Sequence, residues 1–168
     1  MRITRAEEQA IRLAIRLARD GDQRTLQELA IEEGLPEPTV AKVLAELRNA
    51  EVVRAIRGRK GGYELTRAPR AISVSDLLQA VGPERFSGRF CQSQRPGAAA
   101  CTRGDECRLR SVWDYLESRL FRVLDQTSLA DLLETDDAVR RHLDAAWHED
   151  EATTREIPRR KLVKAVAR

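Results

Sequence analysis

The chain has 168 residues, of which 42% are apolar and 34% charged, enough for one packed core of ordinary domain size. No apolar run reaches the roughly 18 residues that a membrane-spanning helix needs. The acidic pair Glu7 and Glu8 interrupts the region where a secretory signal would be apolar. Three cysteines is an odd number, which argues against a closed disulfide framework. We therefore expect a cytoplasmic protein.

The net charge of +3, from 30 basic and 27 acidic residues, hides an uneven distribution along the chain. Residues 54–70 hold six basic residues and one acid, a local charge of +5. Residues 128–151 hold eight acids and two arginines, a local charge of −6, and residues 155–168 return to +5. Two basic segments around an acidic one favour a polyanionic partner.

Three helices are predicted in the first 50 residues. Apolar residues recur at helical spacing until the breaker at 20–22, and the same helix carries a basic stripe on another face. This stripe consists of Arg12, Arg16 and Arg19. A second helix begins at Thr25, which forms a capping box with Glu28, and ends at Gly34. Pro36 and Pro38 then open a third helix, because proline is tolerated in a first helical turn.

Two short β-prone runs, 52–56 and 63–65, flank a glycine-rich basic turn and predict a hairpin. Two helices joined by a tight turn and followed by a basic hairpin are typical of a winged helix-turn-helix. The predicted fold class is therefore mainly α with a small β-hairpin wing. The candidate base readers are Glu37, Thr39 and Lys42. The candidate wing contacts to DNA are Arg57, Arg59, Lys60, Gly61, Gly62 and Tyr63. The alternative is a three-helix protein-interaction domain with a solvated basic loop.

A fourth helix is predicted from Ser73, which caps with Asp76, to about Gly82. The cysteines follow in a segment without helical or strand period. They are Cys91, Cys101 and Cys107, in the spacing C-x9-C-x5-C. Thiolates bind iron–sulfur clusters or zinc. Because the segment lacks C-x2-C and a nearby histidine, a cluster is favoured over zinc, and unligated thiols remain the third interpretation.

A long helix is predicted from about Glu106 to Gln126. Its apolar residues repeat at spacings of four and three, which is the seam of a helix that pairs with a second helix. The seam consists of Leu109, Trp113, Leu116, Leu120, Val123 and Thr127. We expect a short acidic helix at 128–134, a further helix from Asp137 to Trp147, and a mobile tail after Glu151. No phosphate-binding loop or nucleophile–base pair is found, so an enzyme is not expected.

Several motifs in order are similar to those of the Rrf-type winged-helix regulators, whose members include IscR, NsrR and RirA. The likeness is carried by the opening 1–7, the wing 53–65, the helix start 72–78 and the segment 127–132. It covers roughly residues 1–135 and is closest to the cluster-binding subset with three cysteines. The chain is then divided into a DNA-binding domain (1–82), a cysteine-bearing loop (83–105), a dimerisation region (106–135) and a C-terminal helix with a basic tail (136–168).

This resemblance implies a homodimer that reads a palindromic operator in double-stranded DNA, most often as a repressor. It also implies an iron–sulfur cluster on the three cysteines that senses nitric oxide, redox state or iron supply. IscR-like members have a histidine ligand where this chain has Arg110, which favours a 4Fe-4S over a 2Fe-2S cluster. NsrR-like members use an acidic residue of the other subunit, matching Glu8, which could equally be a solvated first-turn acid. The alternative function is a thiol- or zinc-dependent regulator of the same fold.

Overall fold

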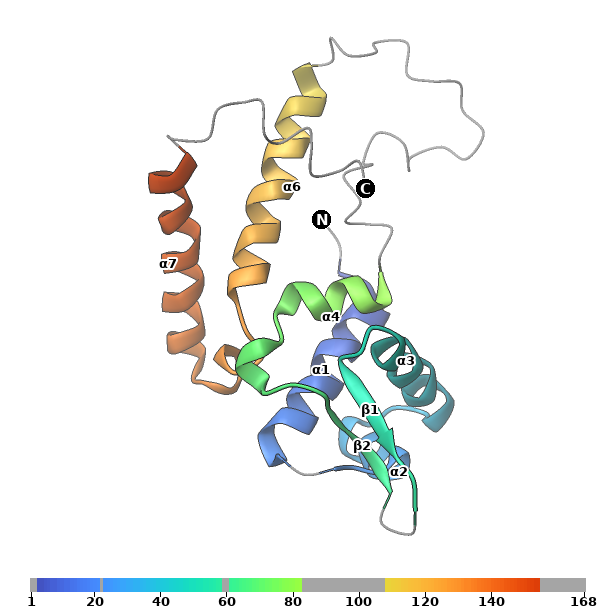
Figure 1. Ribbon diagram of the computed structural model, residues 1–168. Coiled ribbons are helices and arrows are strands. Elements are labelled where there is room, and N and C mark those ends of the chain that lie inside the picture. Colours follow the sequence, from blue (N-terminus) through green and yellow to red (C-terminus); the bar gives the residue numbers. More distant parts are fainter. Residues whose placement is uncertain (1–2, 22, 59–60, 83–107, 155–168) are drawn as a thin grey trace, which may run out of the picture.

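The computed structural model describes residues 3–21, 23–58, 61–82 and 108–154 (Figure 1). The cysteines therefore lie outside the described residues. The helices are α1 (Arg5–Asp20), α2 (Leu26–Glu33), α3 (Glu37–Asn49), α4 (Val74–Val81), α6 (Arg108–Gln126) and α7 (Asp136–Thr154), with 3-10 turns at Pro69–Ala71 and Asp131–Leu133. Strands β1 (Val53–Ile56) and β2 (Gly62–Leu65) form an antiparallel hairpin. The predicted fold class, mainly α with a β-hairpin wing, is confirmed.

Side-chain caps begin three of the helices, each as a reciprocal capping box that satisfies two backbone N–H groups. The boxes are Thr4 with Glu7 for α1, Thr25 with Glu28 for α2, and Ser73 with Asp76 for α4. The last two were predicted from the spacing. Gly21 and Gly34 end α1 and α2 in the left-handed conformation, with φ of 66° and 64°. The helix-turn-helix therefore has its boundaries where local sequence chemistry predicts them.

Helices α1 to α4 enclose one apolar core. Each contributes the stripe that its helical spacing predicts, and the hairpin and residue 129 complete the packing. The residues with the largest fully buried side chains include Leu13, Leu29, Leu44, Leu47, Ile72, Leu77 and Leu129. Because α3 packs on this core with one face, its opposite face is left for solvent or a ligand.

A third segment pairs with the hairpin beside β2. The register pairs Val53 with Leu65 and Ile56 with Gly62. On the outer edge of β2, Arg24 and Tyr63 exchange both backbone hydrogen bonds, at 3.0 and 2.7 Å. The segment between α1 and α2 is thus joined to the wing by main-chain hydrogen bonds.

Main-chain hydrogen bonds also join α6 to the winged domain. The N–H of Val74 donates to the carbonyl of Thr127, and the N–H of Leu129 donates to the carbonyl of Ile72, both at 2.8 Å. Ile72 and Leu129 have no exposed surface, and Thr127 is buried. The segment after α6 is therefore part of the winged domain's core.

The C-terminal region differs from the prediction in two places. Residues 128–134 contain a single 3-10 turn, Asp131–Leu133, instead of a short helix, because the backbone of Glu134 is extended and ends the turn. Helix α7, which lies beside α6 (Figure 1), continues to Thr154 and not only to Trp147. No glycine or proline occurs between 148 and 154 to end it. Among the described helices, none is long and apolar enough to cross a membrane.

Candidate nucleic-acid interface

The three predicted base readers lie on the outer side of α3. Glu37 and Lys42 are exposed and Thr39 is partly exposed, while the opposite stripe of Val40, Val43, Leu44 and Leu47 is buried. Pro36 precedes the first turn and Pro38 lies within it, so this end of the helix begins without a side-chain cap. The start of α3 therefore presents polar side chains on a helix whose position is fixed by its buried face.

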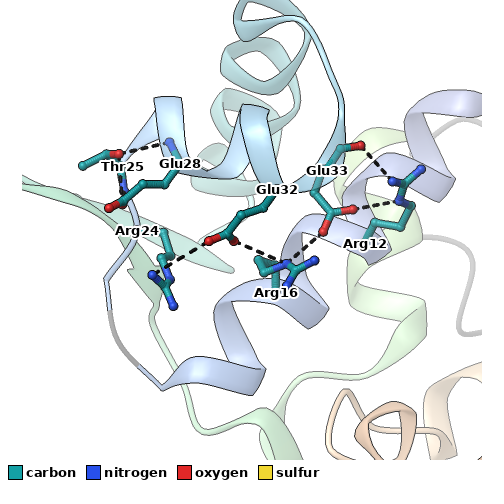
Figure 2. A network of polar contacts seen from close by, with 7 residues as sticks. All are labelled: Arg12, Arg16, Arg24, Thr25, Glu28, Glu32 and Glu33. Atoms are coloured by element: carbon teal, nitrogen blue, oxygen red, sulfur yellow. Dashed lines mark hydrogen bonds and ion pairs between the residues drawn. The ribbon is translucent and has the colours of Figure 1, made fainter.

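An ionic network holds α2, the helix before α3, against α1 (Figure 2). The carboxylate of Glu33 accepts hydrogen bonds from Nε of Arg12 at 2.8 Å and from Nε of Arg16 at 3.0 Å, and its side chain is only 8% exposed. Arg12 also donates to the backbone carbonyl of Glu33 at 2.9 Å. Glu32 lies 3.4 Å from Arg16 and 3.9 Å from Arg24. The network ends at the residue before the turn that leads to α3.

The predicted basic stripe of α1 is thus largely engaged inside the protein. Arg12 and Arg16 neutralise carboxylates of α2, so their charge is not available as a separate surface for a polyanion. At the other end of α2, the backbone N–H and the hydroxyl of Thr25 donate to Glu28 and lower the pKa of that carboxyl. Side-chain carboxylates therefore hold both ends of α2.

Close main-chain packing explains the paired glycines of the wing. A Cβ atom on Gly62 would lie 2.6 Å from the carbonyl oxygen of Arg24, and one on Gly61 would collide with the carbonyl oxygen of Ile56. Gly58 has a φ of 121°, and its carbonyl accepts from the N–H of Gly61 at 2.8 Å. Only residues without a side chain allow the turn to close this tightly.

The wing side chains divide into inward and outward groups. Tyr63 is partly buried and packs against the core, and Arg54 pairs with Glu64 across the two strands. Arg57 is exposed. Arg59 and Lys60 lie outside the described residues. Of the predicted wing contacts that the structure describes, Arg57 is therefore the cation that faces solvent.

The candidate fourth cluster ligand, Glu8, lies in the first turn of α1. Its side chain is 61% exposed, and Oε1 lies 3.7 Å from Nη1 of Arg12. The neighbouring Glu7 is buried instead, and a Cβ on Gly82 would come within 2.9 Å of its Oε1. Gly82, the last described residue before the predicted cysteine loop, therefore lies beside the first turn of α1. Within the described ranges, no group of three or more metal-binding side chains is found.

The predicted dimerisation seam of α6 is exposed at one end and buried at the other. Trp113 and Leu116 are 40% and 46% exposed, while Leu120 is partly buried and Val123 is 7% exposed. The side chain of Leu109 lies outside the described residues. The exposed part of the seam is therefore the half of α6 that lies away from the winged domain.

The sequence profile of the Rrf2 family, described as an iron-dependent transcriptional regulator, matches residues 3–135. The chain belongs to the Rrf2 family. This Rrf2 regulator is 34% identical over 142 residues to an Rrf2-like helix-turn-helix transcriptional regulator of Rhodobacter capsulatus, covering 78% of this chain and 91% of the relative. It is 33% identical over 136 residues to the transcriptional repressor NsrR of Streptomyces coelicolor, covering 79% and 88%.

The structure of CymR, the global cysteine regulator of B. subtilis, is similar with a TM-score of 0.63 and 25% identity, covering 79% of this chain and 96% of that one. These matches confirm the family suggested by the ordered motifs and the interpretation as a transcriptional regulator and not an enzyme. Helix α7 begins after the last residue that the family profile matches. The profile therefore says nothing of what α7 contributes to this Rrf2 regulator.

Sequence reasoning missed two structural supports of the interface. Thr4 and Glu7 form a capping box whose spacing is visible in the sequence and could have been found. The bonds of Glu33 to two arginines join different helices, and no local spacing indicates them.

Proposed function

We propose that this Rrf2 regulator is a homodimeric repressor that binds a palindromic operator in double-stranded DNA. The observation that carries the proposal is the position of α3, whose polar face is exposed beside the wing while its other face and its preceding helix are fixed. A helix of this size fits the major groove. The arrangement is that of a recognition helix held in a fixed position, with a basic hairpin beside it.

The side chains on α3 suit recognition of base edges. The ammonium of Lys42 can donate to the O6 and N7 acceptors of guanine, and the carboxylate of Glu37 can accept from the N4 amino group of cytosine. Thr39 offers a hydroxyl and a methyl group to either strand. On the wing, Arg57, Arg59 and Lys60 would contact phosphates, which supply affinity without sequence information.

The homodimer is proposed to form along the seam of α6. Its exposed apolar residues Trp113 and Leu116 need a partner, and their four-and-three spacing suits a second helix of the same kind. A two-fold axis between the copies would place two α3 helices on successive major grooves, about 34 Å apart. That geometry makes the operator a palindrome.

We further propose that Cys91, Cys101 and Cys107 hold an iron–sulfur cluster, with 4Fe-4S favoured. Three thiolates are a donor set suited to such a cluster, and the family profile is described as iron-dependent. Glu8 of the partner subunit is the proposed fourth ligand, supported by the exposure of this side chain. When bound, the cluster would supply a centre sensitive to nitric oxide, oxidation or iron supply. It regulates DNA binding only if it favours one of two states of the dimer.

A second candidate is a thiol- or zinc-dependent regulator without a cluster. The likeness to CymR of Staphylococcus aureus in its oxidized form, with a TM-score of 0.60 and 26% identity, favours this candidate. Anaerobic native mass spectrometry of freshly purified protein distinguishes the two. A dimer with the mass of one cluster per chain supports the cluster, whereas zinc or bare thiols support the alternative. If Glu8 is a ligand, Glu8→Ala changes the visible spectrum and shortens the oxygen lifetime of the cluster. An unchanged spectrum and lifetime remove it from the ligand set.

The wing is tested with the triple variant Arg57→Ala, Arg59→Ala and Lys60→Ala on operator DNA selected from a random-sequence pool. Each lost phosphate contact should reduce the magnitude of the negative slope of log K against log salt by about 0.9. Arg140→Ala removes an exposed cation that lies on neither α3 nor the wing, and it serves as the control. An affinity and a salt slope equal to those of the unsubstituted protein would refute the wing assignment.

A further inference from the structure

The large apolar side chains that are exposed on the described surface concentrate on α6 and α7. Five of the seven lie on these two helices: Val112 (50%), Trp113 (40%), Tyr115 (50%), Leu116 (46%) and Trp147 (42%). Three of the five are aromatic, the type of side chain that most often dominates protein–protein contacts. This helix pair therefore presents the part of the described surface most suited to burial by another protein chain.

The apolar arc on α6 is wider than one partner helix can cover. At about 100° per residue, Trp113, Leu116, Val112 and Tyr115 span an arc of about 160°. A two-stranded coiled coil buries only the narrow seam of alternating four- and three-residue steps. Residues 113 and 116 belong to that seam, whereas residues 112 and 115 extend the arc toward α7. Covering the whole arc requires a second helix beside the partner's α6.

Arg119 of α6 contacts α7 beside this arc. The guanidinium is buried, donates to the backbone carbonyl of Trp147 at 2.8 Å, and lies 4.8 Å from the centre of the Trp147 ring. It also lies 5.9 Å from the ring of Tyr115. The two rings are therefore held beside the same cation, with about half of each still exposed. Trp147 is the α7 residue that continues the apolar surface of α6.

We propose that α7 belongs to the contact with a second copy of this chain, so that the two copies join through four helices. In this arrangement Trp147 and Tyr115 of one protomer pack against α6 of the other, beside the seam. The inference rests on the homodimer of the proposed function and extends it to a helix that the family profile does not include.

The charges of the two helices favour this pairing. Helix α7 carries six acidic residues and two arginines, a net charge of −4, whereas α6 carries four arginines and three acids, a net charge of +1. Two α7 helices side by side would repel each other. Each α7 is therefore expected to lie along the partner's α6 and not along the partner's α7.

The chain's two tryptophans, Trp113 and Trp147, allow a direct test. In the full-length variant Trp113→Phe, Trp147 is the only tryptophan, and sedimentation velocity gives the concentrations at which the protein is dimer or monomer. On dilution into the monomer, the emission of Trp147 should shift to longer wavelength, and quenching by acrylamide should increase. Identical emission and quenching in the two states would overturn the proposal.

The dimer dissociation constant gives a second test. Trp147→Ser should raise it at least about tenfold, the usual scale for an interface tryptophan. Arg141→Ser, at an exposed position of the same helix, should leave it unchanged, and circular dichroism checks that both variants keep their helices. A constant unchanged by Trp147→Ser overturns the inference, even if Trp113→Ser dissociates the dimer. If Trp113→Ser has no effect while Trp147→Ser weakens the dimer, the dimerisation seam of α6 in the proposed function is refuted, and the contact through α7 is supported.

Discussion

Replacing Gly62 by alanine tests whether the wing is held by its contact with the segment between α1 and α2. The added Cβ would lie 2.6 Å from the carbonyl oxygen of Arg24 and 2.8 Å from its carbonyl carbon. Both neighbours are main-chain atoms, so they cannot move aside as a flexible side chain would. We expect the two segments to separate and the wing to change its position.

The magnitude follows from the bonds at this contact. Arg24 and Tyr63 exchange two backbone hydrogen bonds, at 2.7 and 3.0 Å. Losing both costs about 2 kcal/mol, at about 1 kcal/mol net for each. Local overpacking adds about 1 kcal/mol, for a total of about 3 kcal/mol. For a chain of this length the Tm should fall by roughly 6 to 12 °C. Displacing the wing cations should also weaken operator binding about tenfold, the equivalent of about 1.4 kcal/mol.

Gly21→Ala is the matched control. Gly21 has a φ of 66°, and a Cβ there would meet no atom within 4 Å. The substitution therefore carries only the conformational cost of about 1 kcal/mol, without a collision. Thermal unfolding followed by circular dichroism and operator binding followed by fluorescence anisotropy compare the two variants. If Gly62→Ala unfolds at the temperature of Gly21→Ala and binds DNA as the unsubstituted protein does, the explanation of the paired glycines is wrong.

Three further substitutions test the supports of the interface. Glu33→Gln should destabilise the fold by about 2 kcal/mol because it removes the charge of a buried carboxylate that pairs with Arg12 and Arg16. Asp136→Asn, at an exposed pair, should cost less than about 0.5 kcal/mol, and equal effects in thermal unfolding would contradict the network. Ser73→Ala should cost about 1 kcal/mol through loss of the α4 cap, and an unchanged Tm would contradict it. Burial alone would raise the pKa of Asp131, but hydrogen bonds from Ser128 outweigh it and lower that pKa. The ionised carboxyl of Asp131 therefore stabilises the fold above the unfolded pKa of about 3.9, and this stabilisation is lost as the pH falls through the lower folded pKa. The difference in Tm between the unsubstituted protein and Asp131→Asn should shrink below about pH 4. A difference that stays constant with pH would contradict this explanation.

The sequence predicts best those features whose chemistry is local. Thr25 and Ser73 begin α2 and α4 as their spacing to Glu28 and Asp76 predicts. A capping box needs only residues three apart, and a buried stripe needs only helical spacing. The glycine-rich turn likewise predicts the hairpin, because its conformation depends on its own residues. For these elements the local preference and the tertiary fold agree.

Features that depend on distant residues were missed. Arg12 and Arg16 form a basic stripe in the sequence, but the stripe's partner, Glu33, lies on another helix. The sequence shows the stripe but not the interhelical ionic network in which two of its arginines take part. The edge contact of Tyr63 with Arg24 has no local signal either, because it joins a strand to an interhelical segment. The candidate base readers remain a prediction, placed by the structure on the exposed side of α3.

The junction between α6 and the winged domain limits how a signal could reach α3. Val74 and Leu129 are bonded through their main chains to residues 127 and 72, and the side chains there belong to the core. The hydroxyl of Thr127 donates to the carbonyl of Val123 at 2.7 Å, which continues the last turn of α6 into this junction. Bending at this point would break buried hydrogen bonds without replacement. In the proposed dimer, a change at the exposed half of α6 is therefore expected to rotate each winged domain as a whole. The spacing between the two α3 helices would change, while the contacts within each winged domain would stay the same.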